Sequence, residues 1–266
     1  MTNPDPRELL DLALEAARKG GALAARGQEG ISVLDTKSSP TDVVTEMDRA
    51  TEELIRGVLL GARPSDAILG EEGGAARGSS GVRWLVDPID GTVNYLYGRA
   101  EWGVSVAAEV DGVVVAGVVE APVRGRTYTA VRGGGARRNG EPISAAPPTT
   151  LDMALVATGF GYEARRRRRQ AEVLATVLPR VRDIRRLGSA ALDLCAVAEG
   201  TVNAYYERGT NPWDWGAGAL IAAEAGARVA GLRGAPPNFD LLLAAVPGLF
   251  EQLHDLLEPL GADTDG

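Results

Sequence analysis

The sequence has few of the residues on which histidine and thiol chemistry depend. Its 266 residues include one histidine, His254, and one cysteine, Cys195. A Ser-His-Asp triad or a multi-histidine zinc site would have to use His254. We interpret this residue instead as an ordinary member of a surface amphipathic helix over residues 248–257. A single cysteine excludes an intrachain disulfide, which fits a reducing cytoplasm.

Long hydrophobic runs are also missing from the sequence. No apolar stretch reaches the ~18 residues that a membrane-spanning helix needs, so we expect no membrane partner. Residues 1–15 contain four acidic side chains and lack a basic start followed by an apolar run. We therefore expect no secretory signal peptide and a cytoplasmic location.

Basic charge is scarce relative to acidic charge. The formal net charge is -8 and the pI is near 4.9, which disfavours nucleic-acid binding through a broad basic surface. Five consecutive arginines, Arg165 to Arg169, are the exception. They would form either an anion-binding patch or the solvated start of a helix beside Glu163 and Glu172, and we favour the second interpretation.

The first half of the chain carries helical and strand patterns in a mixed order. Hydrophobic residues make up 45% of the sequence and charged residues 24%, which excludes disorder for most of the chain. The patterns predict helices at 6–26 and 41–60 and a strand at 67–69. A flexible glycine-rich loop is predicted at 73–81. A strand at 83–86 then ends at Asp87, and Asp111-Gly112 marks a hairpin turn. The antiparallel meander around this turn is predicted at 103–109, 113–120 and 126–131.

The second half alternates between strands and helices after Pro147-Pro148. The expected strands lie at 154–158, 184, 202–206, 228–230 and 241–245. The expected helices lie between and after them at 164–178, 189–198, 213–225 and 248–257. This alternation predicts layered α/β packing of two halves, residues 1–150 and 151–266.

The segment Asp87-Pro88-Ile89-Asp90 brings two carboxylates to the end of an apolar strand. At about 5 Å and an effective dielectric constant near 20, their repulsion costs on the order of 3 kcal/mol. A divalent cation would offset this cost, and the Ile89 carbonyl would add an oxygen ligand. The alternative is a capped turn in which both aspartates are solvated.

Further acids occur at the ends of other predicted elements. Glu71 and Glu72 follow a short strand, and Asp214 lies between two tryptophans at the start of a helix. Taken alone, these are a solvated pair and an acid favoured by the helix dipole. Taken together, oxygen ligands without a histidine or thiolate cluster favour Mg²⁺, with Mn²⁺ possible, over zinc.

The residues after the Asp87–Asp90 pair suit phosphate chemistry. The backbone amides of Gly91 and Thr92 could hold a phosphate if they begin a helix. The Thr92 hydroxyl could orient a nucleophilic water if an acid accepts its proton, and Asp48 is the candidate. The alternative for Asp48 is an ordinary acid on a helix surface.

Four ordered motifs resemble the inositol monophosphatase family. They lie at 37–48, 70–72, 84–94 and 213–218, and the similarity extends from about residue 8 to about residue 230. The resemblance implies an α/β fold, the layered αβαβα sandwich of the inositol monophosphatase and fructose-1,6-bisphosphatase type. It also implies Mg²⁺-dependent hydrolysis of a small phosphate monoester by a homodimer, with lithium inhibition in many members. Inositol 1-phosphate is the favoured substrate; histidinol phosphate, fructose 1,6-bisphosphate and 3′-phosphoadenosine phosphates are alternatives.

The same resemblance implies where two or three metal ions would bind. The first would be held by Glu71, Asp87 and the Ile89 carbonyl, and the second by Asp87, Asp90 and Asp214. A third, weaker ion would use Glu71 and water, and Glu71 would thereby take part in catalysis. Residues supporting these ligands from behind would be Glu72, Lys37 and Asp42.

The resemblance also assigns the reacting groups. Thr92 with Asp48 would orient the attacking water, and the amides of Gly91 and Thr92 would receive the phosphate. Contacts to the sugar alcohol are implied for Asp90, Ala190 and Glu207. Residues 231–240 form a short, proline-rich segment where relatives have a more polar strand and turn, a difference that bears on the substrate.

A function of another class is a metal-stabilised regulatory or interaction protein that keeps the fold. The run Arg165 to Arg169 could then be a partner contact. A binding module would not need Thr92 and Asp48 together with the four carboxylates, so we favour the enzyme and expect no nucleic-acid partner.

Overall fold

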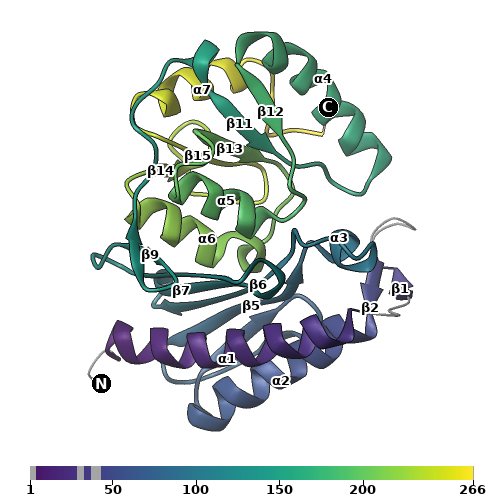
Figure 1. Ribbon diagram of the computed structural model, residues 1–266, viewed down its shortest axis with the longest axis vertical. Coiled ribbons are helices and arrows are strands. Elements are labelled where there is room, and N and C mark those ends of the chain that lie inside the picture. Colours follow the sequence, from purple (N-terminus) through teal and green to yellow (C-terminus); the bar gives the residue numbers. More distant parts are fainter. Residues whose placement is uncertain (1–3, 29–32, 37–42, 266) are drawn as a thin grey trace.

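The computed structural model describes residues 4–28, 33–36 and 43–265. Figure 1 shows the described elements stacked in five layers, with the N-terminus beside the first layer and the C-terminus beside the last. The first layer holds helices α1 (Pro6–Gly27) and α2 (Glu46–Ala62), the middle layer α5 (Ala190–Ala198) and α6 (Pro212–Glu224), and the last α4 (Ala164–Val177) and α7 (Leu249–Leu257). A β-sheet separates each pair of helical layers, so the predicted αβαβα sandwich is confirmed.

The first sheet has eight strands in the order β10-β9-β8-β7-β6-β5-β3-β4. Its strands are β3 (Ala67–Gly70), β4 (Gly74–Ala76), β5 (Val82–Asp90), β6 (Gly103–Val110), β7 (Val113–Ala121), β8 (Arg126–Val131), β9 (Ala136–Arg138) and β10 (Glu141–Ile143). All neighbouring pairs are antiparallel except β3 and β5. The predicted hairpin at Asp111-Gly112 is confirmed, since it joins β6 and β7.

The second sheet has five strands in the order β12-β11-β13-β15-β14. Its strands are β11 (Leu155–Thr158), β12 (Asp183–Arg185), β13 (Ala204–Glu207), β14 (Arg228–Ala230) and β15 (Leu242–Ala245). Strand β11 runs parallel to both of its neighbours, whereas β15 is antiparallel to both of its own. Strands β1 (Val33–Thr36) and β2 (Val43–Thr45) form a separate antiparallel pair, and the short helix α3 (Thr92–Leu96) follows β5.

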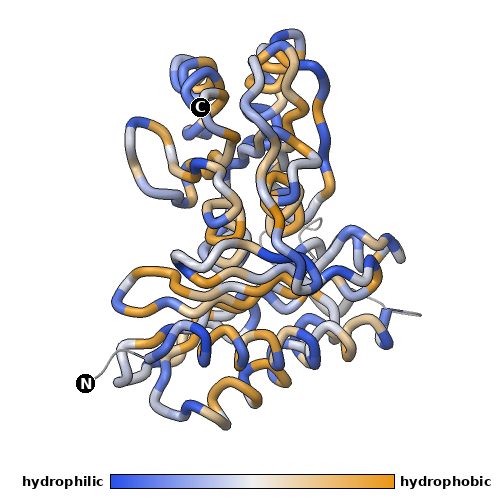
Figure 2. The backbone as a smooth tube through the Cα atoms, turned by 60° about the vertical axis from the view of Figure 1, so that its left-hand side comes forward, coloured by the Kyte–Doolittle hydropathy of each residue, from blue (hydrophilic) through white to orange (hydrophobic). Residues whose placement is uncertain are grey.

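The middle of helix α6 is apolar on all sides because it lies between the two sheets. Seven consecutive residues, 216–222, are buried, a pattern typical of a helix enclosed by protein. Small residues allow the close approach: a Cβ on Gly216 would lie 2.8 Å from Leu85 Cδ1, and one on Gly117 would lie 2.9 Å from the Ala217 backbone. Figure 2 shows the matching pattern in the first sheet, whose strands carry apolar stretches while the connecting loops are largely polar.

Several predicted boundaries are wrong for identifiable reasons. The helix predicted from residue 41 begins at Glu46, because Thr45 caps it: Thr45 Oγ1 accepts from the Asp48 amide, and Asp48 Oδ2 accepts from the Thr45 amide. The predicted loop 73–81 contains strand β4, which pairs with β3. The strand expected to end before Asp87 continues to Asp90.

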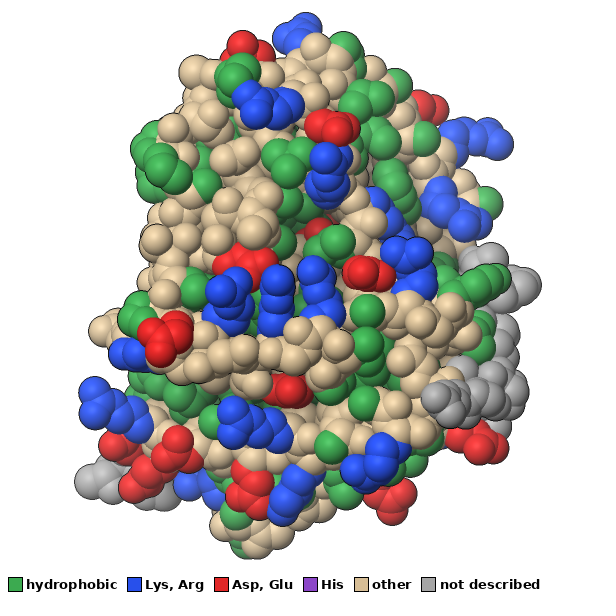
Figure 3. Space-filling model, in the orientation of Figure 1, with side chains coloured by type: hydrophobic (Ala, Val, Ile, Leu, Met, Phe, Trp, Pro, Cys, Tyr) green, Lys and Arg blue, Asp and Glu red, His purple; other side chains and the backbone are tan. Residues whose placement is uncertain are grey.

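The charge distribution on the surface and the composition of the helices bear on binding to nucleic acid and to membranes. Figure 3 shows basic and acidic side chains interspersed on the viewed face, with a short basic row across its middle. None of the helices in the described ranges combines the length and apolar character needed to cross a membrane.

Candidate active site

One cavity of about 350 Å³ opens between the two sheets, at the ends of strands and helices from both halves of the chain. Its wall gathers five acidic residues that the sequence analysis selected: Glu71, Asp87, Asp90, Glu207 and Asp214. Ile89, Gly91, Thr92 and Ala190 line the same cavity. Residues more than 140 positions apart in the sequence therefore meet in one place.

An irregularity at the end of β5 places Asp87 and Asp90 on the same wall. Residues three apart in a regular strand point to opposite faces. The register with β6 shifts between Asp87 and Asp90, and such an irregularity redirects side chains. Pro88, which has no amide hydrogen to donate to the ladder, lies within the shift. Asp87 is 2% exposed, and its Oδ1 accepts from the Ile89 amide at 3.0 Å.

Asp90 links the first sheet to helix α5. Its Oδ2 accepts from the Ser189 hydroxyl and from the Ala191 amide, each at 2.6 Å. Burial raises the pKa of Asp90 to about 6, because these two hydrogen bonds offset burial only partly and the Glu71 charge adds to it. The carboxylate is thus held in place while its charge is incompletely compensated.

Asp214 reaches the same cavity from the first turn of α6. Its Oδ2 accepts from the Asn211 amide at 2.6 Å, which fixes the side chain at the helix start. Burial raises the pKa of Asp214 well above its usual value, and the charges of Glu71 and Asp90 raise it further. Three carboxylates from separate elements therefore repel one another across this space.

The donor chemistry of the cavity suits a hard cation. The groups are carboxylate and carbonyl oxygens, the ligands that Mg²⁺ and Mn²⁺ prefer, and a cation would relieve the repulsion that raises the two aspartate pKa values. Within residues 4–28, 33–36 and 43–265, no three or more acidic, histidine or cysteine side chains already form a group that could hold a metal ion. The chemical type of these residues and their position in the cavity wall therefore fit a cation. They line an open cavity and do not form a closed set of metal ligands.

Thr92 and Asp48 form the second part of the site. Thr92 follows Gly91, which has φ 99°, and it begins the short helix α3. The Thr92 hydroxyl lies 3.2 Å from Asp48 Oδ1 and 3.1 Å from the Ile89 carbonyl oxygen. Asp48 is fully buried, and its Oδ2 accepts from the Thr45 amide and hydroxyl at 2.7 and 2.5 Å. It is therefore a fixed internal acceptor, not an acid on the helix surface.

Glu207 stands on the wall supplied by the second sheet. Its Oε2 accepts from the Tyr205 hydroxyl at 2.7 Å. Burial raises the pKa of Glu207 to about 7; the Tyr205 hydrogen bond and the Arg186 charge lower it, and the Asp90 charge raises it. An acceptor thus lines the same cavity as Ala190, which begins α5.

Other selected residues lie elsewhere. Lys37 and Asp42 are outside the described residues. Glu72 is not among the described residues that line the cavity. His254 is in α7, where its Nε2 accepts from the Arg233 amide at 3.0 Å, in agreement with its interpretation as an ordinary helix residue.

Glu52 and Arg166 are among the contributors that were not identified from the sequence. Glu52, buried on α2, accepts from the amides of Glu72 and Gly73 at 2.7 and 2.8 Å and from Arg56 at 2.9 Å. It thereby fixes the turn that carries Glu71. The sequence feature that could have identified Glu52 is its spacing of four residues from Asp48, because this spacing places both acids on one face of the helix. The second is Arg166, which lines the cavity and whose side chain is only 14% exposed, so the solvated interpretation of the arginine run is wrong for this residue.

Comparisons with known proteins agree with this fold. Residues 5–258 match the sequence profile of the inositol monophosphatase family. The chain is 46% identical to the inositol-1-monophosphatase SuhB of Mycobacterium tuberculosis over 97% of each chain. It is 37% identical to a Nus factor SuhB of Pasteurella multocida over 96% of this chain and 97% of that one. The solved structure of Mycobacterium tuberculosis SuhB is similar with a TM-score of 0.84 and 42% identity, covering 98% of this chain and 100% of that one. The chain therefore belongs to the inositol monophosphatase family, and it is a phosphoric monoester hydrolase.

Proposed function

We propose that this enzyme hydrolyses a small polyol phosphate, with inositol 1-phosphate as the favoured substrate, in a Mg²⁺-dependent reaction. The observation that carries the proposal is that four carboxylates and Thr92 line one cavity, while the buried Asp48 lies within hydrogen-bond distance of the Thr92 hydroxyl. The acids supply cation ligands, and the pair supplies a means of orienting water, so the cavity has the groups that hydrolysis of a phosphate ester requires.

The metal ligands in this proposal are Glu71, Asp87, Asp90, Asp214 and the Ile89 carbonyl, for two or three ions. Bound Mg²⁺ would neutralise charge on the phosphate oxygens and would make water a better nucleophile. Mn²⁺ accepts the same oxygen ligands and could take its place. The protein itself keeps these ligands in position through the amides of Ile89, Ala191 and Asn211.

Thr92 is proposed to hold the attacking water. A hydroxyl has one hydrogen, so the Ile89 carbonyl and Asp48 compete for it. If the Ile89 carbonyl binds a cation, Asp48 remains as the acceptor. Thr92 Oγ1 would then accept a hydrogen bond from water in the cavity and leave the water oxygen lone pair available to the phosphorus. Asp48 is suited to this task because Thr45 holds its other oxygen.

The remaining groups are proposed to bind the substrate. The amides of Gly91 and Thr92 would donate to the phosphate, and Glu207 would accept from hydroxyls of the polyol with Asp90 and Ala190 nearby. Glu72, Lys37 and Asp42 remain proposals as supporting residues, and homodimer formation remains a prediction that light scattering can test.

A panel of phosphate esters tests the proposed activity. Inorganic phosphate release would be measured with inositol 1-phosphate, histidinol phosphate, fructose 1,6-bisphosphate and 3′-phosphoadenosine 5′-phosphate, in Mg²⁺, in EDTA and in Mg²⁺ with Li⁺. We expect Mg²⁺-dependent release with the highest kcat/KM on inositol 1-phosphate and inhibition by Li⁺. Release that persists in EDTA, or none from any ester in Mg²⁺, would contradict the proposal.

Glu52→Gln is expected to lower the apparent affinity of the enzyme for Mg²⁺ without removing any proposed metal ligand. The amide has a single acceptor oxygen, whereas Glu52 now serves the Glu72 and Gly73 amides with separate oxygens. Losing support behind a metal ligand typically costs 10–100-fold in metal affinity or activity. We expect the Mg²⁺ concentration for half-maximal activity to rise about tenfold. The matched control is Glu53→Gln, at an exposed neighbouring position; equal behaviour of the two variants would contradict the role.

A second candidate function comes from the relatives rather than from the cavity. The Pasteurella multocida relative, similar over nearly the whole chain, is named a Nus factor. This name favours a regulatory interaction carried by the same fold. An inactive variant that retains its fold would separate the two functions, because binding of a protein partner does not require the carboxylate cluster.

A further inference from the structure

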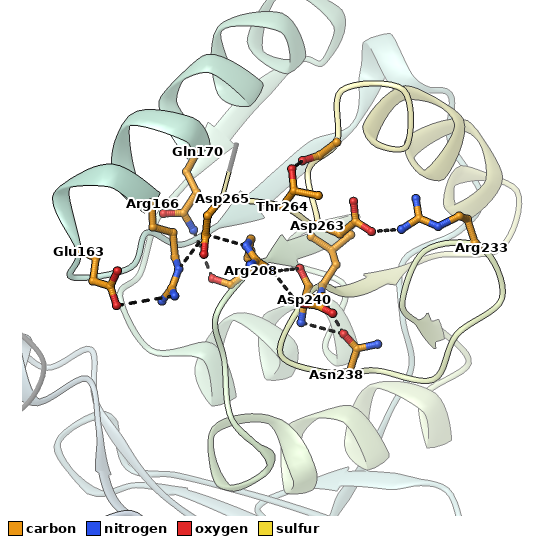
Figure 4. A network of polar contacts seen from close by, with 12 residues as sticks. Glu163, Arg166, Gln170, Arg208, Arg233, Asn238, Asp240, Asp263, Thr264 and Asp265 are labelled. Carbon is orange, nitrogen blue, oxygen red and sulfur yellow. Dashed lines mark hydrogen bonds and ion pairs between the residues drawn. The ribbon is translucent and has the colours of Figure 1, made fainter.

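Arg166 is the member of the arginine run that faces the active-site cavity. Helix α4 begins at Ala164, and the Arg166 side chain is only 14% exposed, whereas Arg167 and Arg168 are exposed. Arg166 lines the same cavity as the acidic cluster. Figure 4 shows it among side chains from three distant segments of the chain.

Contacts on two sides fix the direction of Arg166. Its Nε donates to Asp265 Oδ1 at 3.1 Å, and its guanidinium carbon lies 5.0 Å from the centre of the Phe239 ring. Asp265 Oδ1 also accepts from Arg208 Nε at 2.9 Å, and Arg208 in turn donates to Asp240 at 2.9 Å. Figure 4 displays this chain of ion pairs. The acid near the end of the chain thus orients an arginine at the cavity wall.

Glycines make room for Arg166 and for Glu207 on the same wall. A Cβ on Gly161 would lie 2.8 Å from Arg166 Cδ, and one on Gly209 would lie 3.0 Å from Arg166 Nη1. A Cβ on Gly159 would overlap the Glu207 carboxylate. All three glycines line the cavity. A larger residue at any of them would displace one of the two polar side chains, so the backbone is shaped to seat both.

We propose that Arg166 is a specificity-determining residue that, together with Glu207, recognises the hydroxyl groups of the substrate. This inference rests on the proposed polyol phosphatase function. A carboxylate only accepts hydrogen bonds and a guanidinium only donates them, whereas a hydroxyl does both. Neighbouring hydroxyls of a polyol can therefore satisfy Glu207 and Arg166 at once. Asp265 and Phe239 are positioning residues, because they act on the substrate through Arg166.

The charges around Arg166 favour hydroxyls over a second anionic group. Asp265 lies 3.1 Å from Arg166 and Glu163 lies 3.9 Å from it, so its positive charge is already shared. A second phosphate at this wall would also approach the Glu207 carboxylate. The pair therefore suits a polyol monophosphate better than a bisphosphate.

Arg166→Met tests the proposal, because it keeps much of the length of the side chain and removes every donor. KM and kcat would be measured with inositol 1-phosphate and with phenyl phosphate, a monoester without hydroxyls. Loss of a hydrogen bond to a charged group corresponds to about a tenfold change or more. We expect KM for inositol 1-phosphate to rise about tenfold, while KM for phenyl phosphate stays within about twofold. The control is Arg168→Met, on the exposed side of the same helix.

Asp265→Asn provides a second variant that leaves Arg166 and Glu207 in place. It is expected to raise KM for inositol 1-phosphate by about threefold, since it weakens the charge-assisted bond that orients Arg166. The exposed Asp255→Asn is its control. This variant also decides the matter if Arg166→Met does not fold.

The outcomes separate this inference from the proposed function. A selective rise in KM for inositol 1-phosphate supports the role of Arg166. An equal effect on both substrates, or no effect on either, would overturn that role and leave the proposed function standing. A wild-type enzyme that hydrolyses phenyl phosphate but not inositol 1-phosphate would overturn both the polyol assignment and this inference.

Discussion

Asp90→Asn is expected to lower kcat/KM by about a thousandfold while leaving the fold intact. The asparagine oxygen can still accept from Ser189 and Ala191, as Asp90 Oδ2 does at 2.6 Å. Its amide group would then replace the other carboxylate oxygen and present a donor where the cavity needs an acceptor. Removing one preorganised electrostatic contact in an active site typically costs about 10²–10³ in rate, and Asp90 is proposed to serve both the metal and the substrate.

A matched substitution separates this effect from a general loss of charge. Asp152→Asn removes an acid at an exposed position and should retain wild-type kcat/KM. When Mg²⁺ is removed, Asp152→Asn should melt as the wild type does. Asp90→Asn should melt no lower than the wild type, because it removes one of the buried charges that repel one another. Activity of Asp90→Asn within about tenfold of wild type would remove Asp90 from the proposed machinery. The variant also tests the regulatory alternative, which predicts that partner binding survives the loss of turnover.

Mg²⁺ at millimolar concentration is expected to raise the Tm of EDTA-treated protein by about 5–10 °C. Asp90 and Asp214 have raised pKa values because burial and neighbouring charges disfavour their ionised forms, so a cation that binds the folded state relieves a cost of folding. Ligand at a hundred times its Kd stabilises by about 2.7 kcal/mol. For a chain of this size, each kcal/mol shifts Tm by about 2–4 °C.

Salt and mutation provide the controls for this measurement. NaCl at the same ionic strength should shift Tm much less, because a monovalent ion screens the acids without binding among them. Asp90→Asn should show a smaller Mg²⁺ shift than wild type. Identical melting with and without Mg²⁺ in EDTA-treated wild-type protein would contradict a cation site at these acids.

Local patterns were sufficient for the parts of the fold that depend on neighbouring residues. The turn at Asp111-Gly112 and the small-residue helix α6 are examples, since a short stretch of consecutive residues determines each of them. Strand β4 was not predicted because its extended conformation depends on pairing with β3, which the local sequence does not show. The irregularity in β5 was missed for a similar reason: it is defined by its register with β6.

The site divides in the same way between local and distant contributions. Motifs that resemble the family selected Thr92 and four acids that do line the cavity, namely Glu71, Asp87, Asp90 and Asp214. Asp48 and Glu72 were selected as well but are not among the described residues that line it. The contact between Arg166 and Asp265 joins residues 99 positions apart. No local sequence pattern around either residue predicts this contact. The helical period alone shows that an unbroken run of five arginines cannot all face solvent on a packed helix, which is where the solvated interpretation went wrong.

Anomalous diffraction from a crystal grown with Mn²⁺ tests the convergence of the acids most directly. We expect Mn²⁺ peaks inside the cavity, with oxygens of Glu71, Asp87, Asp90 and Asp214 as ligands. A well-ordered structure without such peaks, in which these carboxylates turn separately toward bulk solvent, would contradict this expectation.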